Sequence, residues 1–272
     1  MAAPTIIKGS DHFFVTTYEG NGGGQKVGNF VPFTDNGTIA KSCIFNHPDE
    51  PELSRTPSSG GNRKTFTVST WIKLCDEFGQ RRMVFCQGAS GNDYFYIEFN
   101  ASNQLEVNAN DGSGSVDLDL KTNRTFEDTS KFYHIVVAVD TTQSTASNRV
   151  KVYVDGDQIT SFASETYFSQ DYNTQVNHTV EAAVGNWIAT GYSTDGYLAE
   201  FNLVDGTALT PSTFGLTDTS TGRWIPKSLT GITYGTNGLR LEFANSAGQT
   251  IGDDTSGNGN DLAVSNLAIT DL

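Results

Sequence analysis

The residues best suited to chemistry in this sequence lie on one short predicted strand. Side chains of a strand alternate between its two faces, so Tyr94, Tyr96 and Glu98 share one face, opposite three apolar residues. Aromatic rings stack on the apolar face of a pyranose, and a carboxylate accepts hydrogen bonds from its hydroxyls. We therefore predict a glycan-binding face, which Trp71 and Tyr153 can join because each alternates with apolar neighbours. The alternative is that these rings simply cover a sheet face or a contact between subunits.

A second oxygen-rich segment lies near the C-terminus and reads DDTSGNGND. Its carboxylate and amide side chains are those of Asp253, Asp254, Asn258, Asn260 and Asp261. Calcium takes about six to eight oxygen ligands, and a glycine-rich loop can curl such groups around one ion. The segment is therefore the best candidate for a metal site, although its spacing is not that of an EF-hand. A metal-free turn held by Asp and Asn side chains explains the same composition.

Carboxylates arranged for glycoside hydrolysis are harder to find. Glucanases built as β-sandwiches carry three acidic residues at alternate positions of one strand, so that all three share a face. Asp117 and Asp119 come nearest to this, with Glu98 on another strand, and no third carboxylate has the required spacing. We read the Asp pair as solvated carboxylates and predict no catalytic residues and no enzyme activity. The histidines are scattered along the chain: His12, His47, His134 and His178.

The composition excludes several classes of partner. The 272 residues include 31 acidic and 17 basic side chains, and a formal net charge of −14 repels nucleic acid and anionic lipid. No run reaches the ~20 apolar residues of a membrane span, and the first residues do not resemble a signal peptide. We therefore expect neither nucleic-acid binding nor membrane insertion, and synthesis in a cytoplasm without secretion. The cysteines, Cys43, Cys75 and Cys86, are read as buried small residues, with a Cys75–Cys86 disulfide as the alternative.

Short antiparallel strands must position these residues. Alternating apolar runs bounded by Gly, Asn, Asp and Ser recur, and no long stretch has helical periodicity. Asp155 and Gly156 mark a tight hairpin turn, while Thr210 and Pro211 mark one helical turn. The predicted strands cover residues 66–74, 83–86, 93–99, 104–108, 116–120, 133–139, 150–154, 181–188, 196–204 and 238–243.

These elements predict an all-β fold, an antiparallel double-sheet jelly-roll sandwich, formed by residues 41–272. Residues 1–40 contain hydrophobic islands separated by a GNGGG segment, and we predict an extended N-terminal arm that can dock on a neighbouring subunit. The predicted core residues are Phe66, Val68, Ile72, Phe95, Ile97, Phe99, Ile135, Val137, Val152 and Leu203.

Five segments in this order resemble the laminin-G-like/concanavalin A-like lectin-glucanase superfamily. They are KTFTVSTWIK (64–73), YHIVVAV (133–139), VKVYVDG (150–156), GYLAEFNLV (196–204) and DTSGNGND (254–261). The resemblance implies a structural role for His134 in its strand. It also implies a structural Ca²⁺ in the C-terminal loop, with Glu200 near it.

The late position of DTSGNGND, together with residues 53–65, is similar to domains in structural proteins of marine tailed phages. That resemblance implies a non-enzymatic structural or recognition protein on a virion surface: a capsid decoration, head fibre or tail appendage. Its implied partners are other virion proteins, copies of itself in a trimer, and a host-surface glycan. The first alternative is a free carbohydrate-binding lectin module or the binding domain of a depolymerase. The second, less favoured alternative is a glycoside hydrolase.

Overall fold

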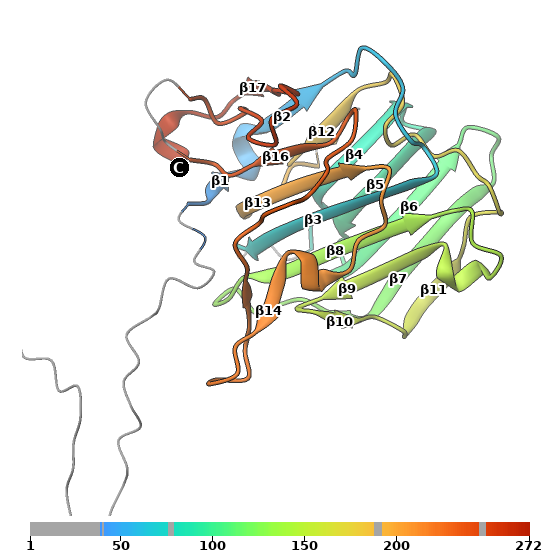
Figure 1. Ribbon diagram of the computed structural model, residues 1–272, viewed down its shortest axis with the longest axis horizontal. Helices are drawn as coiled ribbons and strands as arrows, with labels where there is room; N and C mark the ends of the chain where they lie inside the picture. Colours follow the sequence, from blue (N-terminus) through green and yellow to red (C-terminus); the bar gives the residue numbers. More distant parts are fainter. Residues whose placement is uncertain (1–38, 40, 76–78, 188–191, 245–248) are drawn as a thin grey trace, which may run out of the picture. The chain divides into compact units, whose positions relative to one another are not determined.

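The computed structural model describes residue 39 and residues 41–75, 79–187, 192–244 and 249–272 (Figure 1). These residues form antiparallel sheets and short 3-10 turns without an α-helix, which confirms the predicted double-sheet sandwich. No helix among them is long and apolar enough to cross a membrane. The predicted arm over residues 1–40 lies outside the described residues apart from residue 39, and so stays a prediction.

The first sheet has seven strands in the order β1-β13-β3-β8-β9-β10, with β16 also paired to β13 (Figure 1). Its strands are β1 (Cys43–Phe45), β3 (Thr65–Leu74), β8 (Tyr133–Asp140), β9 (Val150–Val154), β10 (Asp157–Gln158), β13 (Gly196–Asp205) and β16 (Leu239–Leu241). We call it the seven-stranded sheet.

The second sheet has eight strands in the order β11-β7-β6-β5-β4-β12-β2-β17. Its strands are β2 (Glu52–Arg55), β4 (Arg82–Ser90), β5 (Asp93–Phe99), β6 (Gln104–Asp111), β7 (Val116–Thr125), β11 (Phe162–Thr166), β12 (Ala182–Val184) and β17 (Ala263–Ser265). We call it the eight-stranded sheet. Strands β14 (Gly215–Thr217) and β15 (Trp224–Pro226) form a separate hairpin.

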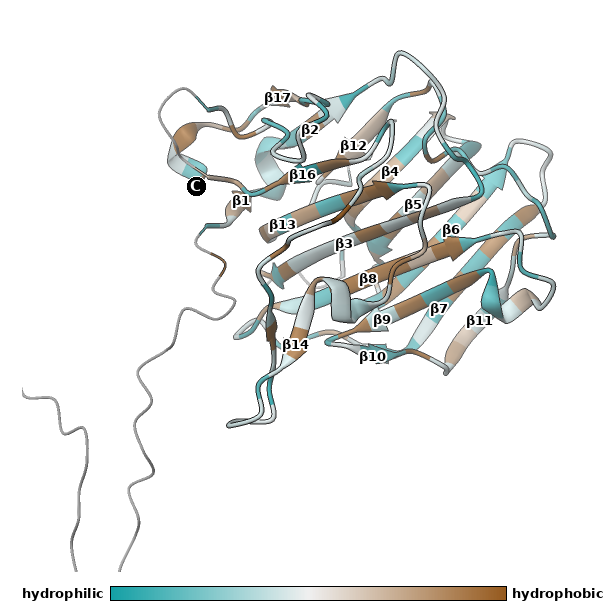
Figure 2. Cartoon of the chain, viewed as in Figure 1, coloured by the Kyte–Doolittle hydropathy of each residue, from teal (hydrophilic) through white to brown (hydrophobic). Residues whose placement is uncertain are grey.

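The hydrophobic core lies between the two large sheets, and all ten predicted core residues are buried in it. Phe66 of β3 meets Phe95 of β5 edge to face, with ring centroids 5.4 Å apart. The ring centroids of Phe201 of β13 and Phe85 of β4 lie 5.8 Å apart. Each pair joins one sheet to the other, so aromatic packing holds the layers together. Figure 2 shows the hydrophobic residues that recur along the central strands.

The outer face of the seven-stranded sheet is covered by the chain itself. Trp224 of the β14–β15 hairpin stacks 6.0 Å from His134 and donates its Nε1–H to His134 Nδ1 at 3.0 Å. Trp71 stacks on the same imidazole at 4.5 Å, and Ser69 Oγ lies 3.0 Å from its Nε2. His134 and Trp71 are both buried. His134 is therefore a structural residue, as the resemblance implies, and this part of the face is closed.

Two glycines make room for the Trp224 ring. A Cβ added to Gly156 or Gly215 would lie within 2.6 Å of ring carbons of Trp224. Gly156 also follows Asp155 in the turn between β9 and β10, where φ is 52° at Asp155 and 89° at Gly156. These positive φ values are those of a tight hairpin turn, which confirms the predicted turn.

Three local expectations need correction. The predicted strand 181–188 is only β12, because Gly185 has a φ of 83° and leaves the extended conformation. Thr210 does precede a 3-10 turn at Pro211, but its hydroxyl bonds Ser212 Oγ and does not cap the turn. Of the three cysteines, the first and last are buried as predicted, whereas Cys75 is half-buried.

Candidate functional site

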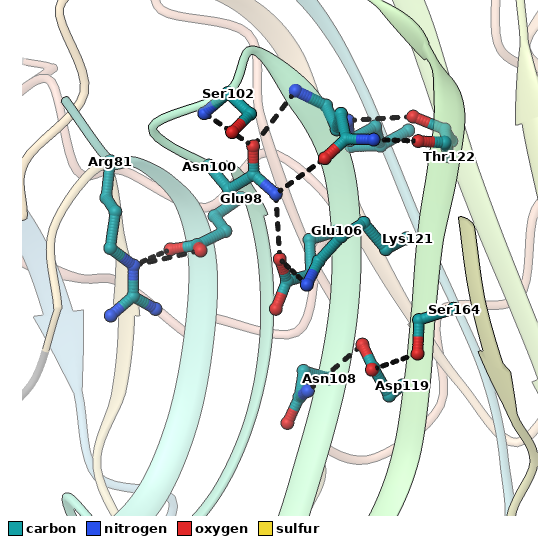
Figure 3. Close-up of polar contacts among 12 residues, drawn as sticks. Arg81, Glu98, Asn100, Ser102, Glu106, Asn108, Asp119, Lys121, Thr122 and Ser164 are labelled. Atoms are coloured by element: carbon teal, nitrogen blue, oxygen red, sulfur yellow. Dashed lines mark hydrogen bonds and ion pairs between the residues drawn. The ribbon is translucent and has the colours of Figure 1, made fainter. Parts of the chain in front are cut away.

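Neighbouring strands of the eight-stranded sheet place a row of charged side chains on its outer face (Figure 3). Glu98 of β5 is opposite Glu106 of β6, which in turn is opposite Lys121 of β7. Adjacent carboxylates repel each other, and two cations offset this repulsion. Arg81 Nε lies 2.9 and 2.8 Å from the Glu98 carboxylate oxygens, and Lys121 Nζ lies 3.4 Å from Glu106 Oε2.

The two glutamates of this row have different environments. The Glu98 side chain is only 1% exposed, and this burial raises its pKa to about 7, although Arg81 acts to lower it. Glu106 accepts hydrogen bonds from the Tyr96 hydroxyl at 2.9 Å and from Asn100 Nδ2 at 3.0 Å. Glu98 is therefore part of a buried ion pair that supports the face, not a group that a ligand can touch.

A second row lies one step along the same strands. Tyr96 is opposite Asn108, and Asn108 is opposite Asp119. Asn108 Nδ2 donates to Asp119 Oδ1 at 3.4 Å, and the Ser164 hydroxyl of β11 donates to Asp119 Oδ2 at 2.5 Å (Figure 3). Asp119 is half-buried and has no salt bridge within the described residues. The row forms a polar floor of amide, carboxylate and hydroxyl groups.

An aromatic wall lies beside this floor. The rings of Tyr94 and Tyr96 stack 5.2 Å apart, and Trp187 meets them edge-on at 5.2 and 5.5 Å. The Arg81 guanidinium lies 5.3 Å from the Tyr96 ring centre and 4.5 Å from that of Tyr192. Tyr96 and Trp187 are buried, whereas Tyr94 is half-buried and Tyr192 is 39% exposed. The last two rings therefore present surface to a ligand, and the first two support them.

The chain matches one family model, described as the concanavalin A-like lectin/glucanases superfamily, over residues 53–213. That span is more than half of the sequence and includes the strands from β3 to β13. The chain belongs to this superfamily. No curated protein sequence matches it.

Solved structures that are similar to this chain share little sequence identity with it. One is domain 4 of an extracellular arabinanase from Geobacillus stearothermophilus, in complex with arabinotriose. It is 18% identical to this chain, the match covers 65% of this chain and 76% of that domain, and the TM-score is 0.47. The heptameric SAP-like pentraxin from Limulus polyphemus is 15% identical, with 62% of this chain and 76% of that chain covered and a TM-score of 0.43. Domains LG4-5 of the mouse laminin alpha1 chain are 14% identical, with 74% of this chain and 48% of that chain covered and a TM-score of 0.43.

Within this superfamily fold, the residues predicted to bind glycan divide between two faces. Tyr94, Tyr96 and Glu98 do lie together on the outer face of the eight-stranded sheet. Trp71 and Tyr153 belong to β3 and β9 of the other sheet, where Trp71 is buried against His134 and Tyr153 packs beside Val136. Their expected place beside Tyr94 was wrong, because alternation gives the face of a strand but not the sheet that it joins.

The structure adds residues that the sequence reasoning missed. Glu106 and Asn108 alternate with buried apolar residues on β6, so the argument used for β5 could have found them. Arg81, Trp187 and Tyr192 lie at or beyond strand ends, where no alternation reveals them, and they reach the face only through the fold.

The two aspartates considered for hydrolysis have separate environments. The pairing of β6 with β7 shifts register between Ala109, which is opposite Leu118, and Asn110, which is opposite Val116. Asp117 is therefore the extra residue of a β-bulge in β7. The Asp117 carboxylate accepts the Tyr172 hydroxyl at 2.9 Å, and the Tyr172 ring packs against the main core. Asp119 instead contacts the floor of the outer face. A pair acting together was considered, and the two carboxylates instead bond different partners.

The C-terminal loop is closed by its own hydrogen bonds. Asp254 Oδ1 accepts the backbone N–H groups of Arg240 and Ser256, at 2.9 and 2.8 Å. Its Oδ2 accepts the Asn260 N–H at 2.9 Å and the Ser256 hydroxyl at 2.8 Å. Asp261 Oδ1 accepts the Asp254 N–H, and the Asp253 carboxylate is bound by the backbone and hydroxyl of a neighbouring threonine. Both oxygens of the central carboxylate are therefore in use.

The remaining candidates do not present oxygens to one point. Asn258 and Asn260 donate their amide N–H groups to the Gly238 carbonyl, at 2.8 and 2.9 Å. Glu200 binds Arg240 through both carboxylate oxygens, at 2.9 and 3.0 Å. Across the part of the chain that the structure describes, no group of three or more acidic, His or Cys side chains could hold a metal. In this conformation the loop's hydrogen bonds occupy the oxygens of Asp254, and these residues do not fit the Ca²⁺ that the resemblance implies.

We expect the melting temperature of the protein to be the same in millimolar Ca²⁺ and in excess chelator. A ligand that binds only the folded state raises stability, and this loop is already satisfied without one. Differential scanning fluorimetry with Mg²⁺ as the control measures this directly. A melting temperature that rises with Ca²⁺ but not with Mg²⁺ would show that the loop rearranges into a calcium site.

Proposed function

We propose that this protein is a non-enzymatic carbohydrate-binding module that binds glycan on the outer face of its eight-stranded sheet. One observation carries the proposal: the half-buried ring of Tyr94, stacked on Tyr96, lies on the same face as the polar floor around Asp119. The partly exposed ring of Tyr192 lies against Arg81. Rings that stack on a sugar, together with a few oriented polar groups, are the usual components of a glycan site. The covered outer face of the seven-stranded sheet offers no comparable surface around Trp71.

The carboxylates of this face support binding rather than hydrolysis. Glycosidases need two acidic groups that reach opposite sides of the scissile bond. Glu98 is buried and bound to Arg81, and the Asp117 carboxylate accepts the Tyr172 hydroxyl. We therefore expect no turnover of laminarin, agar or alginate.

We further propose that the module acts on the surface of a tailed-phage virion, with other virion proteins and copies of itself as partners. The order of the sequence motifs supports this, and the acidic charge suits a solvent-facing coat component. A protein inventory and a reconstruction of purified particles test it. Absence of the chain from particles would favour the alternatives, a free lectin or the binding domain of a depolymerase.

Affinity electrophoresis of the full chain through gels that contain single polysaccharides tests the binding function. We expect retardation by at least one polysaccharide, without release of reducing sugar in the same mixture. Serum albumin run in parallel controls for sieving by the gel. If a broad panel of plant, algal and bacterial polysaccharides leaves the mobility unchanged, the proposed function is wrong.

A further inference from the structure

The floor of the proposed glycan site has more hydrogen-bond acceptors than donors. Asn108 is 8% exposed, and its Oδ1 is buried without a hydrogen-bond partner among the described residues, while its Nδ2 points to Asp119. Asp119 accepts one hydrogen bond at each oxygen, although a carboxylate oxygen can accept two. Figure 3 shows Asn108, Asp119 and Ser164 side by side on consecutive strands.

The cations of the face are already committed to other carboxylates. Arg81 is bound to Glu98, and Lys121 is paired with Glu106. Burial raises the pKa of Tyr94, and the nearby Glu106, Glu98 and Asp119 raise it further, while Arg81 lowers it. Three carboxylates and one guanidinium therefore lie near the half-buried Tyr94 ring.

These two features favour one kind of ligand group. A hydroxyl donates a hydrogen bond, so it can bond the half-buried Asp119 carboxylate, whose oxygens can each accept one more. Sulfate and carboxylate groups only accept, and they would add negative charge beside a carboxylate that has no paired cation in the described part of the chain.

We infer that the face selects uncharged glycans, with a hydroxyl-bearing pyranose stacked on Tyr94 and donating to Asp119, and that it rejects sulfated and uronate glycans of the same backbone. This inference rests on the proposed function and assigns its substrate class.

Matched pairs of polysaccharides test the inference by affinity electrophoresis. Suitable pairs are dextran with dextran sulfate, and hydroxyethylcellulose with carboxymethylcellulose. In each pair that binds, we expect the neutral member to bind at least about tenfold more tightly. That binding should change little between about 50 and about 500 mM salt, because no ion pair is formed.

The possible failures are distinguishable. Equal or tighter binding of the charged member, weakened by salt, would overturn the inference and leave the carbohydrate-binding function standing. Binding of neither member in every pair, and of no polysaccharide in the wider panel, would remove the proposed function itself and the inference with it.

The isosteric variant Asp119→Asn tests the residue that carries the selection. It removes one negative charge and replaces an acceptor oxygen by a donor amide, so the affinity for the neutral glycan should fall about fivefold or more. The ratio of the affinities for the neutral and the charged glycan should also fall. Asp157→Asn is the matched control, because Asp157 is exposed on β10 of the other sheet. An Asp119→Asn protein with an unchanged melting temperature and an unchanged neutral-to-charged ratio would show that the inference is wrong.

Discussion

Replacing Tyr94 by alanine is expected to weaken glycan binding by about tenfold or more while leaving the fold intact. Tyr94 is half-buried, and it stacks on Tyr96 with its ring edge against Trp187. Aromatic anchors of this kind often contribute about 2 kcal/mol or more to binding, which is more than a tenfold change in affinity. Removing the ring opens no cavity in the main core, because Tyr94 lies outside it. Isothermal titration with a bound oligosaccharide measures the change.

The matched control for this variant is Tyr153→Ala. Tyr153 is also half-buried on the outer face of a sheet, but that sheet is the seven-stranded one. We expect this change to leave affinity within about twofold of the wild type, since distant sites act independently. Loss of binding in Tyr153→Ala and not in Tyr94→Ala would place the glycan on the opposite face of the sandwich.

Replacing Arg81 by methionine is expected to destabilise the protein by about 2–3 kcal/mol at about pH 9, where Glu98 is ionised in the wild type. Arg81 is the ion-pair partner of Glu98, whose side chain is 1% exposed. Losing one partner of a buried pair leaves an uncompensated charge, which is costlier than losing an exposed salt bridge. The Arg81 side chain is 29% exposed, so the expected loss is at the lower end of the range for buried pairs. Urea unfolding measures it.

The pH dependence identifies the cause of this loss. In the wild type, burial raises the pKa of Glu98 from 4.5 to about 7, so Glu98 contributes stability below about pH 4.5 that is lost as the pH rises to about 7. Removing Arg81 raises this pKa further. Above pH 7 the free energy of unfolding of the variant should therefore continue to fall, by up to about 1.4 kcal/mol per pH unit. In the wild type the contribution of Glu98 to this free energy no longer changes with pH in that range.

A second substitution separates charge from packing. Glu98→Gln in the Arg81→Met background removes the buried carboxylate and should restore most of the lost stability at high pH. If the variant is equally destabilised at pH 5 and pH 9, and Glu98→Gln restores nothing, the role of Arg81 is its contact with the rings of Tyr96 and Tyr192.

The alternation of apolar residues was enough to predict the strands and core of the sandwich. It placed β5 and β9 at their observed bounds and identified ten core residues that are all buried. This works because the face of a side chain depends only on its position along its own strand. Short strands without alternation, such as β1, β2 and β17, were missed, because they are specified by their partners rather than by their own pattern.

The candidate site could be predicted only where it lies within one strand. Tyr94, Tyr96 and Glu98 were found together because they alternate on β5. Whether β3 and β9 join the same sheet as β5 depends on pairing between distant segments, so Trp71 and Tyr153 were misplaced. The C-terminal loop shows a further limit: the same oxygen-rich composition suits a Ca²⁺ site and a turn, and only the positions of the donors around Asp254 distinguish them.

The most direct test of the carbohydrate-binding face is a crystal structure of the protein with an oligosaccharide from a polysaccharide that it binds. We predict a pyranose ring stacked on Tyr94, with a hydroxyl within hydrogen-bonding distance of Asp119 and with Tyr192 at the edge of the site. A sugar bound instead against Tyr153 on the seven-stranded sheet, with the face around Tyr94 empty, would contradict the proposed function.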